Sequence, residues 1–215
     1  MNDHTLPELT ILLSGRGSNM QAIHAACQKG LLKARVSHVI SNNPGAGGLQ
    51  YARDHNIKID VVDHKAYKSR QDFDQALADQ ITGGSPALIL LAGFMRRLSG
   101  DFTRKFHSRL LNIHPSLLPR HPGLNTHQQA IDSLDTWHGC SIHFVTEELD
   151  GGPIIARSVV PVLSTDTPDT LAARVLRKEH QAYWKAAQMC LDNTIECQDG
   201  HIVFQGKTLN YPILL

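Results

Sequence analysis

Leu9-Thr-Ile-Leu-Leu-Ser-Gly-Arg-Gly-Ser-Asn19 is the stretch of this sequence that decides its fold. An apolar run with the length of a strand, Leu9–Leu13, ends in a turn with two glycines, and a helical pattern follows over Asn19–Lys29. A strand that leads through a short turn into a helix is the first half of a βαβ unit, in which the next strand runs parallel to the first. The stretch therefore predicts a parallel sheet with helices packed on it.

Further apolar runs alternate with helical patterns along the first half of the chain. The series predicts an α/β protein, with a Rossmann-like, mostly parallel central sheet and helices on both of its faces. We expect strands at Val36–Ser41, Ile59–Val62, Ala87–Ala92 and Leu110–His114, and helices at Gly48–His55 and Gln71–Thr82.

The second half of the chain predicts a long loop, two strands, a long helix and a hairpin. Residues 115–135 are rich in Pro, His, Gly and Asn, and a loop of this length is often functional. Thr167 and Pro168 suit the N-cap and first position of a helix that ends at Leu191. The other expected elements are strands at Cys140–Val145 and Ile154–Leu163 and a hairpin around Asp199-Gly200. No linker divides the chain, so we expect one domain over residues 1–215.

The composition excludes several classes of function. The 215 residues carry a formal net charge of +1 with scattered Lys and Arg, which argues against nucleic acid and membrane surfaces as partners. No apolar run approaches the ~18 residues of a membrane-spanning helix, and the first residues show no signal-peptide pattern. The four cysteines form no Cys-x-x-Cys pair, which favours a reducing compartment. We therefore expect a cytoplasmic protein.

The turn Ser14–Asn19 has two interpretations. Its glycines let backbone N–H groups approach an anion at the start of the helix, which suits a terminal phosphate. It is not a dinucleotide fingerprint, because Met20 stands where the third glycine belongs and Ser41-Asn-Asn offers no acid for a ribose. In the alternative interpretation it is a tight turn in which Ser18 or Asn19 caps the helix.

An amide donor and a titratable imidazole project together at the end of a predicted strand. Asn112 and His114 are two residues apart, so their side chains point to the same side of the strand. Pro115 disfavours helix at His114, so a loop begins there. A neutral donor beside a proton shuttle suits acyl-type transfer through an oxyanion. The spacing of the surrounding histidines does not predict a metal site.

Three other features have both a structural and a functional interpretation. Ala92–Ser99 follows a buried strand and could line a flat aromatic pocket, although such an apolar segment is more often core. Asp150 stands before two glycines and is an ordinary turn residue unless that turn meets His114. Glu179 falls inside the apolar stripe of the 167–191 helix, where a carboxylate needs a salt bridge or a ligand.

Four motifs follow one another along the chain. They are Ser14-Gly-Arg-Gly-Ser-Asn, Ala92-Gly-Phe-Met-Arg, Asn112-Ile-His-Pro-Ser-Leu-Leu-Pro and His143-Phe-Val-Thr-Glu-Glu-Leu-Asp-Gly-Gly-Pro. In this order they resemble the phosphoribosylglycinamide formyltransferases of purine biosynthesis, a family within the wider group of formyl-folate transferases and hydrolases. The resemblance covers nearly the whole chain, although Arg16 stands where the family usually has Asn and the tail after Leu191 matches too poorly to carry a role.

The resemblance implies direct transfer of the formyl group of 10-formyltetrahydrofolate to the glycine amine of glycinamide ribonucleotide, through a tetrahedral oxyanion intermediate and without a metal. On the matching positions, His114 would move the proton, Asn112 would stabilise the oxyanion, and Asp150 would orient and charge His114. The ribonucleotide would lie against Gly17, Ser18, Asn19 and Glu179, and the folate against Arg70, Met95, Arg96, Arg97, Leu98 and Asn112.

The resemblance also implies a division of the single formyltransferase domain. Its N-terminal half would hold the ribonucleotide phosphate, and its C-terminal half would hold the folate. A cis peptide bond is implied between Leu118 and Pro119. The sequence does not determine the oligomeric state, so a homodimer stays open.

Three other functions compete with this one. A formyltetrahydrofolate hydrolase would use the same three residues with water as acceptor, but it has no need of a phosphate turn and commonly carries an added regulatory domain. A formyltransferase acting on initiator tRNA calls for a basic extension, which the charge of +1 does not support. A non-enzymatic module that binds phosphate metabolites would keep Ser14–Asn19 but has no reason to keep Asn112, His114 and Asp150 together.

Overall fold

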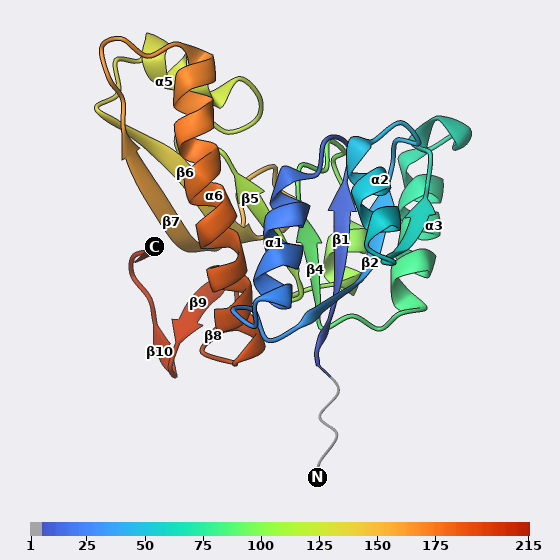
Figure 1. Cartoon of the computed structure of the whole chain (residues 1–215). Helices are drawn as coiled ribbons and strands as arrows, with labels where there is room; N and C mark the ends of the chain where they lie inside the picture. The colour runs from blue at the N-terminus through green and yellow to red at the C-terminus, as the bar shows by residue number, and fades with distance from the viewer. Residues whose placement is uncertain (1–5) are drawn as a thin grey trace. The chain divides into compact units, whose positions relative to one another are not determined.

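The computed structural model of the protein describes residues 6–215, which form two compact units that meet along the chain between Leu111 and Asn112 (Figure 1). The boundary falls inside strand β5 (Leu110–His114) and not in a linker. The expectation of one domain over residues 1–215 stays a prediction. Among the described residues, no helix is long and apolar enough to cross a membrane.

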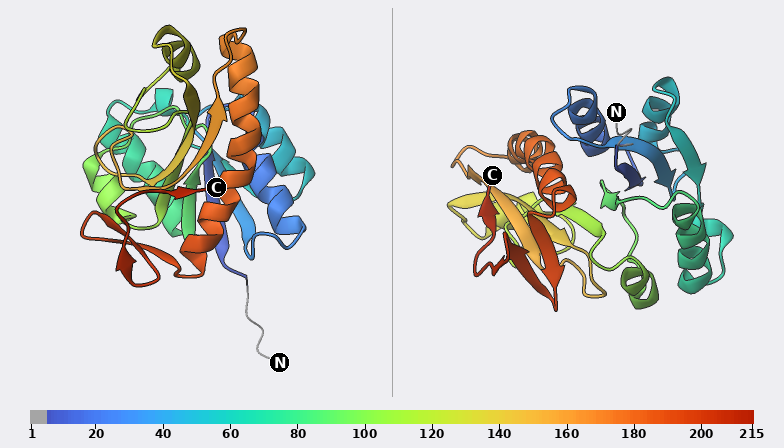
Figure 2. Two further views of the ribbon diagram at one scale, coloured as in Figure 1. Left: turned by 90° about the vertical axis from the view of Figure 1, so that its left-hand side faces the viewer. Right: turned by 90° about the horizontal axis from the view of Figure 1, so that it is seen from below.

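The first unit is a parallel sheet in the strand order β3-β2-β1-β4. Helices α1 and α2 lie on one face of these strands and α3 lies on the other, as the right-hand view of Figure 2 shows. Strands β1 and β4 are covered on both faces, which explains why their sequences are uninterrupted apolar runs. The elements are β1 (Glu8–Leu13), α1 (Ser18–Gln28), β2 (Arg35–Ser41), α2 (Gly47–Asp54), β3 (Lys58–Val61), the 3₁₀ turn η1 (His64–Ala66), α3 (Arg70–Thr82), β4 (Leu88–Leu91) and α4 (Gly100–Lys105).

The second unit has the strand order β5-β6-β7-β11, and α6 packs on β6 and β7 (Figure 1). Strands β6 and β7 are antiparallel, whereas β7 and β11 are parallel. A small antiparallel sheet, β8-β9-β10, follows the end of α6. The elements are α5 (Thr126–Asp132), β6 (Trp137–Phe144), β7 (Ile154–Pro161), α6 (Pro168–Leu191), β8 (Ile195–Gln198), β9 (His201–Phe204), β10 (Lys207–Thr208) and β11 (Ile213–Leu214).

Most of the predicted elements are confirmed. The sheet is mostly parallel and flanked by helices, as the alternation of patterns indicates. Thr167 is the N-cap of α6, where its side chain accepts a hydrogen bond from the Thr170 N–H and Pro168 is the first helical residue. The hairpin around Asp199-Gly200 joins β8 to β9. Helix caps, hairpin turns and apolar patterns depend on residues close together in the chain, so a single sequence is enough to predict them.

Two expectations about local structure are wrong. Residues 115–135 are not all loop, because α5 lies within them. This helix has seven residues and buries only Thr126 and Ala130, too short a stripe to give a periodic pattern. Neither Ser18 nor Asn19 caps α1, because Gly17 takes the N-cap position at φ +75° and no side chain caps the helix. The short elements η1, α4, β10 and β11 were also not predicted.

Candidate active site

Four polar side chains meet in the second unit, where β5 and β6 end. They come from Asn112 and His114 on β5, His143 on β6, and Asp150 in the turn that follows β6. The Asn112 amide nitrogen lies 3.1 Å from His143 Nε2, and Asp150 Oδ2 lies 3.5 Å from His114 Nδ1. His143 Nε2 lies 4.0 Å from the other Asp150 oxygen. The structure therefore brings together Asn112, His114 and Asp150, and it adds His143.

His143 fixes the orientation of the Asn112 amide. Its Nδ1 lies 2.9 Å from the Phe144 carbonyl oxygen, which can only accept, so Nδ1 carries the proton. Burial lowers the pKa of His143 and keeps the ring neutral, which leaves Nε2 as an acceptor for the Asn112 N–H. Asn112 then has a second N–H with which to donate elsewhere. The sequence prediction missed His143. The signal was a polar residue between Ile142 and Phe144 on one strand, which indicates a side chain that points to the opposite face of the sheet from these two.

His114 lies between two acceptors. Its Nε2 donates to the backbone carbonyl of His121 at 3.0 Å, and its Nδ1 faces the Asp150 carboxylate. The side chains of His114 and Asp150 are only 7% and 9% exposed. Each nitrogen of the His114 ring therefore faces an oxygen that can accept a hydrogen bond.

The turn after β6 needs glycine to bring Asp150 to this place. A Cβ atom on Gly152 would lie 1.8 Å from the Phe144 carbonyl oxygen, so only glycine lets the turn press against the end of β6. The backbone N–H of Phe144 donates to the Pro153 carbonyl at 3.0 Å across the same turn. Asp150 itself has a φ of +52°, a left-handed conformation that Asp tolerates better than most residues.

Side chains of β6 and β7 hold the segment that follows His114. The Ser141 hydroxyl accepts from the Leu118 N–H at 3.0 Å and donates to the Ser116 carbonyl at 2.7 Å. The Arg157 guanidinium donates to the Leu118 carbonyl. The expected cis peptide bond between Leu118 and Pro119 is confirmed. The chain that follows β5 is therefore held by buried and part-buried polar contacts.

The turn Ser14–Asn19 lies in the first unit at the carboxyl ends of parallel strands. Gly17 is confined there, because a Cβ atom on it would lie 2.9 Å from Gly48 Cα. The Ser14 hydroxyl donates to Asn42 Oδ1 at 2.5 Å and accepts from the Met95 N–H at 2.8 Å. N–H groups in the first turn of a helix have no acceptor within it, and no side chain caps α1. This arrangement suits an anion at Gly17–Asn19.

Most residues assigned to the folate also lie in the first unit. Met95 is 66% exposed, whereas Leu98 is buried, and the Arg96 guanidinium lies 5.9 Å from the centre of the Phe73 ring. A pocket of about 420 Å³ is lined by Ser14, Asn42, Asn43, Pro44, Asp63, His64, Lys65, Met95 and Arg96. Arg70 is the first residue of α3 and is exposed, as is Arg97.

Glu179 is buried on α6 at 7% exposure, as its place in the apolar stripe predicted. Its negative charge, after burial itself, helps to raise the pKa of Cys140 to about 12, which places the carboxylate near β6. Glu179 and Asn112 belong to the second unit, whereas the other residues assigned to each ligand belong to the first. The expected division of the two ligands between the halves stays a prediction.

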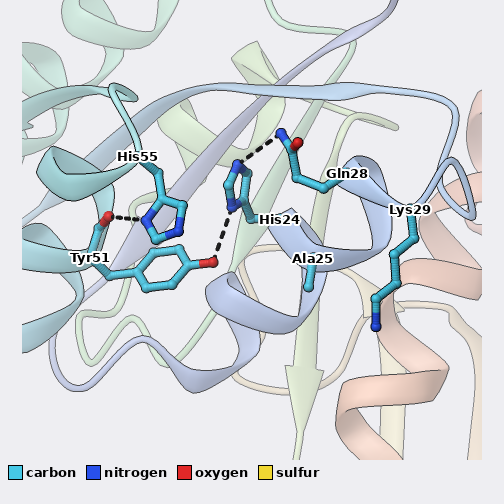
Figure 3. Close-up of a pocket in the computed structure, with 6 residues that line it drawn as sticks. All are labelled: His24, Ala25, Gln28, Lys29, Tyr51 and His55. Atoms are coloured by element: carbon cyan, nitrogen blue, oxygen red, sulfur yellow. Dashed lines mark hydrogen bonds between the residues drawn. The ribbon is translucent and has the colours of Figure 1, made fainter.

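Another group of polar side chains lies between α1 and α2 (Figure 3). His24 is bonded on both sides, with Nδ1 3.1 Å from the Tyr51 hydroxyl and Nε2 3.3 Å from the Gln28 amide. The His55 ring stacks on Tyr51 at 3.9 Å between ring centres. Burial lowers the pKa of His24, which keeps it neutral in this network. These contacts fasten α1 to α2, and we assign them a structural role.

Known proteins match this chain over most of its length. A family model described as formyl transferase matches residues 8–187. The chain belongs to the formyl transferase family. The matched residues of this formyl transferase include Ser14–Asn19, Asn112, His114 and Asp150. Among the described residues, no cluster of three or more His, Cys, Asp or Glu side chains could hold a metal ion.

Three relatives illustrate the match to this formyl transferase. Phosphoribosylglycinamide formyltransferase of Escherichia coli (strain K12) is 42% identical over 201 residues, which are 94% of this chain and 95% of that protein. The phosphoribosylglycinamide formyltransferase of Coxiella burnetii, solved in complex with CHES, has a TM-score of 0.94 at 38% identity and covers 98% of this chain and 99% of that one. Glycinamide ribonucleotide transformylase 1 from Symbiobacterium toebii has a TM-score of 0.90 at 38% identity, with 94% and 95% covered.

Proposed function

We propose that this protein transfers the formyl group of 10-formyltetrahydrofolate to the glycine amine of glycinamide ribonucleotide, a step of purine biosynthesis. The observation that carries the proposal is the cluster of Asn112, His114 and Asp150 in a chain of the formyl transferase family. 10-Formyltetrahydrofolate is the co-substrate of this family. The near full-length similarity to phosphoribosylglycinamide formyltransferases supports the choice of acceptor.

The chemistry follows from the charge that the reaction creates. Attack of the amine on the formyl carbon breaks the carbonyl π bond and places a negative charge on the formyl oxygen. The second N–H of Asn112 and the imidazole of His114 are the groups that stabilise this oxyanion. When the carbonyl re-forms, the bond to N10 of the folate breaks, and the proton lost by the amine moves to N10. The His114–Asp150 pair is the group arranged to carry that proton.

The turn at Gly17–Asn19 supports a phosphorylated acceptor instead of water. A hydrolase of formyltetrahydrofolate would gain nothing from an uncapped helix start that suits an anion. The proposed ribonucleotide contacts are therefore Gly17, Ser18 and Asn19, together with Glu179. The proposed folate contacts are Arg70, Met95, Arg96, Arg97, Leu98 and Asn112.

One assay tests the proposal. Purified protein is given 10-formyltetrahydrofolate with and without glycinamide ribonucleotide, and free tetrahydrofolate and formylated ribonucleotide are measured together. The two products should appear in equal amounts and only when the ribonucleotide is present. Release of tetrahydrofolate at the same rate without ribonucleotide would instead identify a hydrolase.

We also propose a cytoplasmic location and small-molecule partners only. The support is the scattered charge, with a net value of +1, and the free cysteines of the described chain. Cell fractionation followed by detection of the protein tests the location. Sedimentation of the purified protein decides between a monomer and a homodimer.

A further inference from the structure

One short segment of the second unit contacts both members of the His114–Asp150 pair. The backbone carbonyl of His121 accepts the hydrogen bond from His114 Nε2 at 3.0 Å. Two residues later, the backbone N–H of Gly123 donates to Asp150 Oδ2 at 2.9 Å. The segment Arg120–Gly123 thereby sets where the imidazole and the carboxylate lie. Both of these bonds are made by its backbone and not by its side chains.

Asp135 bonds to two side chains of this segment. Its Oδ2 accepts a hydrogen bond from His121 Nε2 at 2.8 Å, and its other oxygen pairs with the Arg120 guanidinium. The side chain of Asp135 is 5% exposed and that of His121 is 10% exposed, whereas Arg120 is 60% exposed. A charge-assisted hydrogen bond is stronger and more directional when it is shielded from water. Of the two Asp135 contacts, the one to His121 is therefore expected to contribute more to holding the segment, which the Ser116 hydroxyl also contacts by donating to the Arg120 carbonyl at 2.6 Å.

The backbone of His121 needs such an anchor. Its φ is +53°, in the left-handed region that residues with a side chain adopt only at an energetic cost. That conformation points its carbonyl at His114 while its ring points at Asp135. If the ring were released, the backbone could relax toward ordinary values and turn the carbonyl away from the catalytic imidazole.

We propose that Asp135 and His121 are positioning residues for the formyl transfer, acting on His114 and Asp150 through the backbone of Arg120–Gly123. The identity of the reaction rests on the proposed function, whereas the positioning of His114 and Asp150 does not. The side-chain hydrogen bonds and ion pairs of these residues are to each other and to Arg120, and not to His114 or Asp150. Their effect is to keep Nε2 of His114 hydrogen-bonded and Nδ1 directed at Asp150, so the imidazole is already aligned when the substrates bind.

The test compares Asp135→Asn and His121→Asn with a matched control. Asn keeps the shape of Asp135 without its charge, and at position 121 it tolerates the left-handed backbone. The control is Asp132→Asn, the same change three residues away, where the exposed carboxylate only accepts a hydrogen bond from Gln128 at 2.7 Å. Arg120→Gln is a second arm, since an exposed ion pair contributes little. We measure kcat, both KM values, the melting temperature and the NMR signal of the His114 Nε2 proton in the free protein.

We expect kcat to fall about tenfold in both anchor variants, with KM values changed less than twofold, since misalignment alone slows such reactions. The His114 Nε2 proton signal should broaden or disappear in these variants and persist in Asp132→Asn and Arg120→Gln. A lower melting temperature with unchanged kcat and an unchanged signal would overturn the proposal, as would a loss of kcat without a change in the signal. The signal is recorded without substrate, so it decides the positioning role even if the wild-type protein does not formylate the ribonucleotide.

Discussion

The amide of Asn112 donates a hydrogen bond to Nε2 of His143 at 3.1 Å, and His143 in turn donates from Nδ1 to the Phe144 carbonyl. The chain of donors runs in one direction only, because a carbonyl cannot donate. It holds the Asn112 amide in the orientation that leaves one N–H for a developing oxyanion. His143 therefore acts on the proposed reaction through Asn112.

A double-mutant cycle tests this dependence. Asn112→Ala should lower kcat by roughly 10²–10³ if the amide stabilises an oxyanion. His143→Phe should lower it by less, about tenfold, because the amide is only left free to turn. The double variant should be no slower than Asn112→Ala alone, since His143 has nothing left to orient. Losses that multiply in the double variant would show that His143 acts independently.

His114→Ala removes the proposed proton carrier. We expect turnover to fall ~10²–10⁴-fold, the usual contribution of a positioned acid–base group. Binding of glycinamide ribonucleotide, measured by calorimetry, should persist, because the proposed phosphate contacts belong to Gly17–Asn19. Turnover near the wild-type rate would remove His114 from the mechanism.

Asp150→Asn tests whether the carboxylate acts through the imidazole. The variant keeps the size of the side chain and an acceptor for the Gly123 N–H, but it removes the charge 3.5 Å from His114 Nδ1. Turnover should drop without a matching loss of affinity for either substrate. The ¹⁵N shifts of the His114 ring, which report the protonation of each nitrogen, should change in the variant. Unchanged shifts would indicate that Asp150 does not act through His114 and is only a turn residue.

Gly17→Ala should weaken the ribonucleotide and spare the folate. The added Cβ would lie 2.9 Å from Gly48 Cα in a left-handed backbone, so the turn must move. Gly30→Ala is the matched control, because Gly30 has a similar φ of +68° just after the same helix but no atom within 4 Å of the new Cβ. Calorimetry should show loss of ribonucleotide affinity in Gly17→Ala only. Equal effects of both variants would indicate a purely structural turn.

The free energy of unfolding should decrease as the pH is lowered through the range in which His138 takes up a proton. Burial, with the neighbouring His127 and His121, lowers the pKa of His138 to about 4, and its ring bonds to His127 at 3.0 Å. The unfolded chain binds a proton near pH 6.5, so this stabilisation is complete above that value and is lost as the pH falls toward about 4. The loss is at most about 3 kcal/mol at 1.36 kcal/mol per pKa unit. Urea unfolding at pH 7 and pH 5 should show a smaller difference in His138→Gln than in the wild type.

The sequence by itself determined the class of the fold and part of the site. The apolar runs and helical patterns depend on near neighbours, so β1, α1 and α6 were predicted with only small errors at their ends. Asn112 and His114 are two apart on one strand, and that spacing alone places them on one side. The ligands of the site came from resemblance instead, because no local pattern specifies which molecule a turn will hold.

Only the tertiary structure decided which distant residues meet. Asp150 reaches His114 because Gly152 lets its turn press on the end of β6, a contact over 36 positions that no local period records. The same holds for His143. The alternating pattern of its strand was visible in the sequence, but the neighbouring strand β5 decides that its side chain meets Asn112. The helix α5 and strand β11 are too short to be stable alone and exist because neighbouring elements cover them. Long-range packing chooses among such local options, and a single sequence does not carry that choice in its short-range pattern.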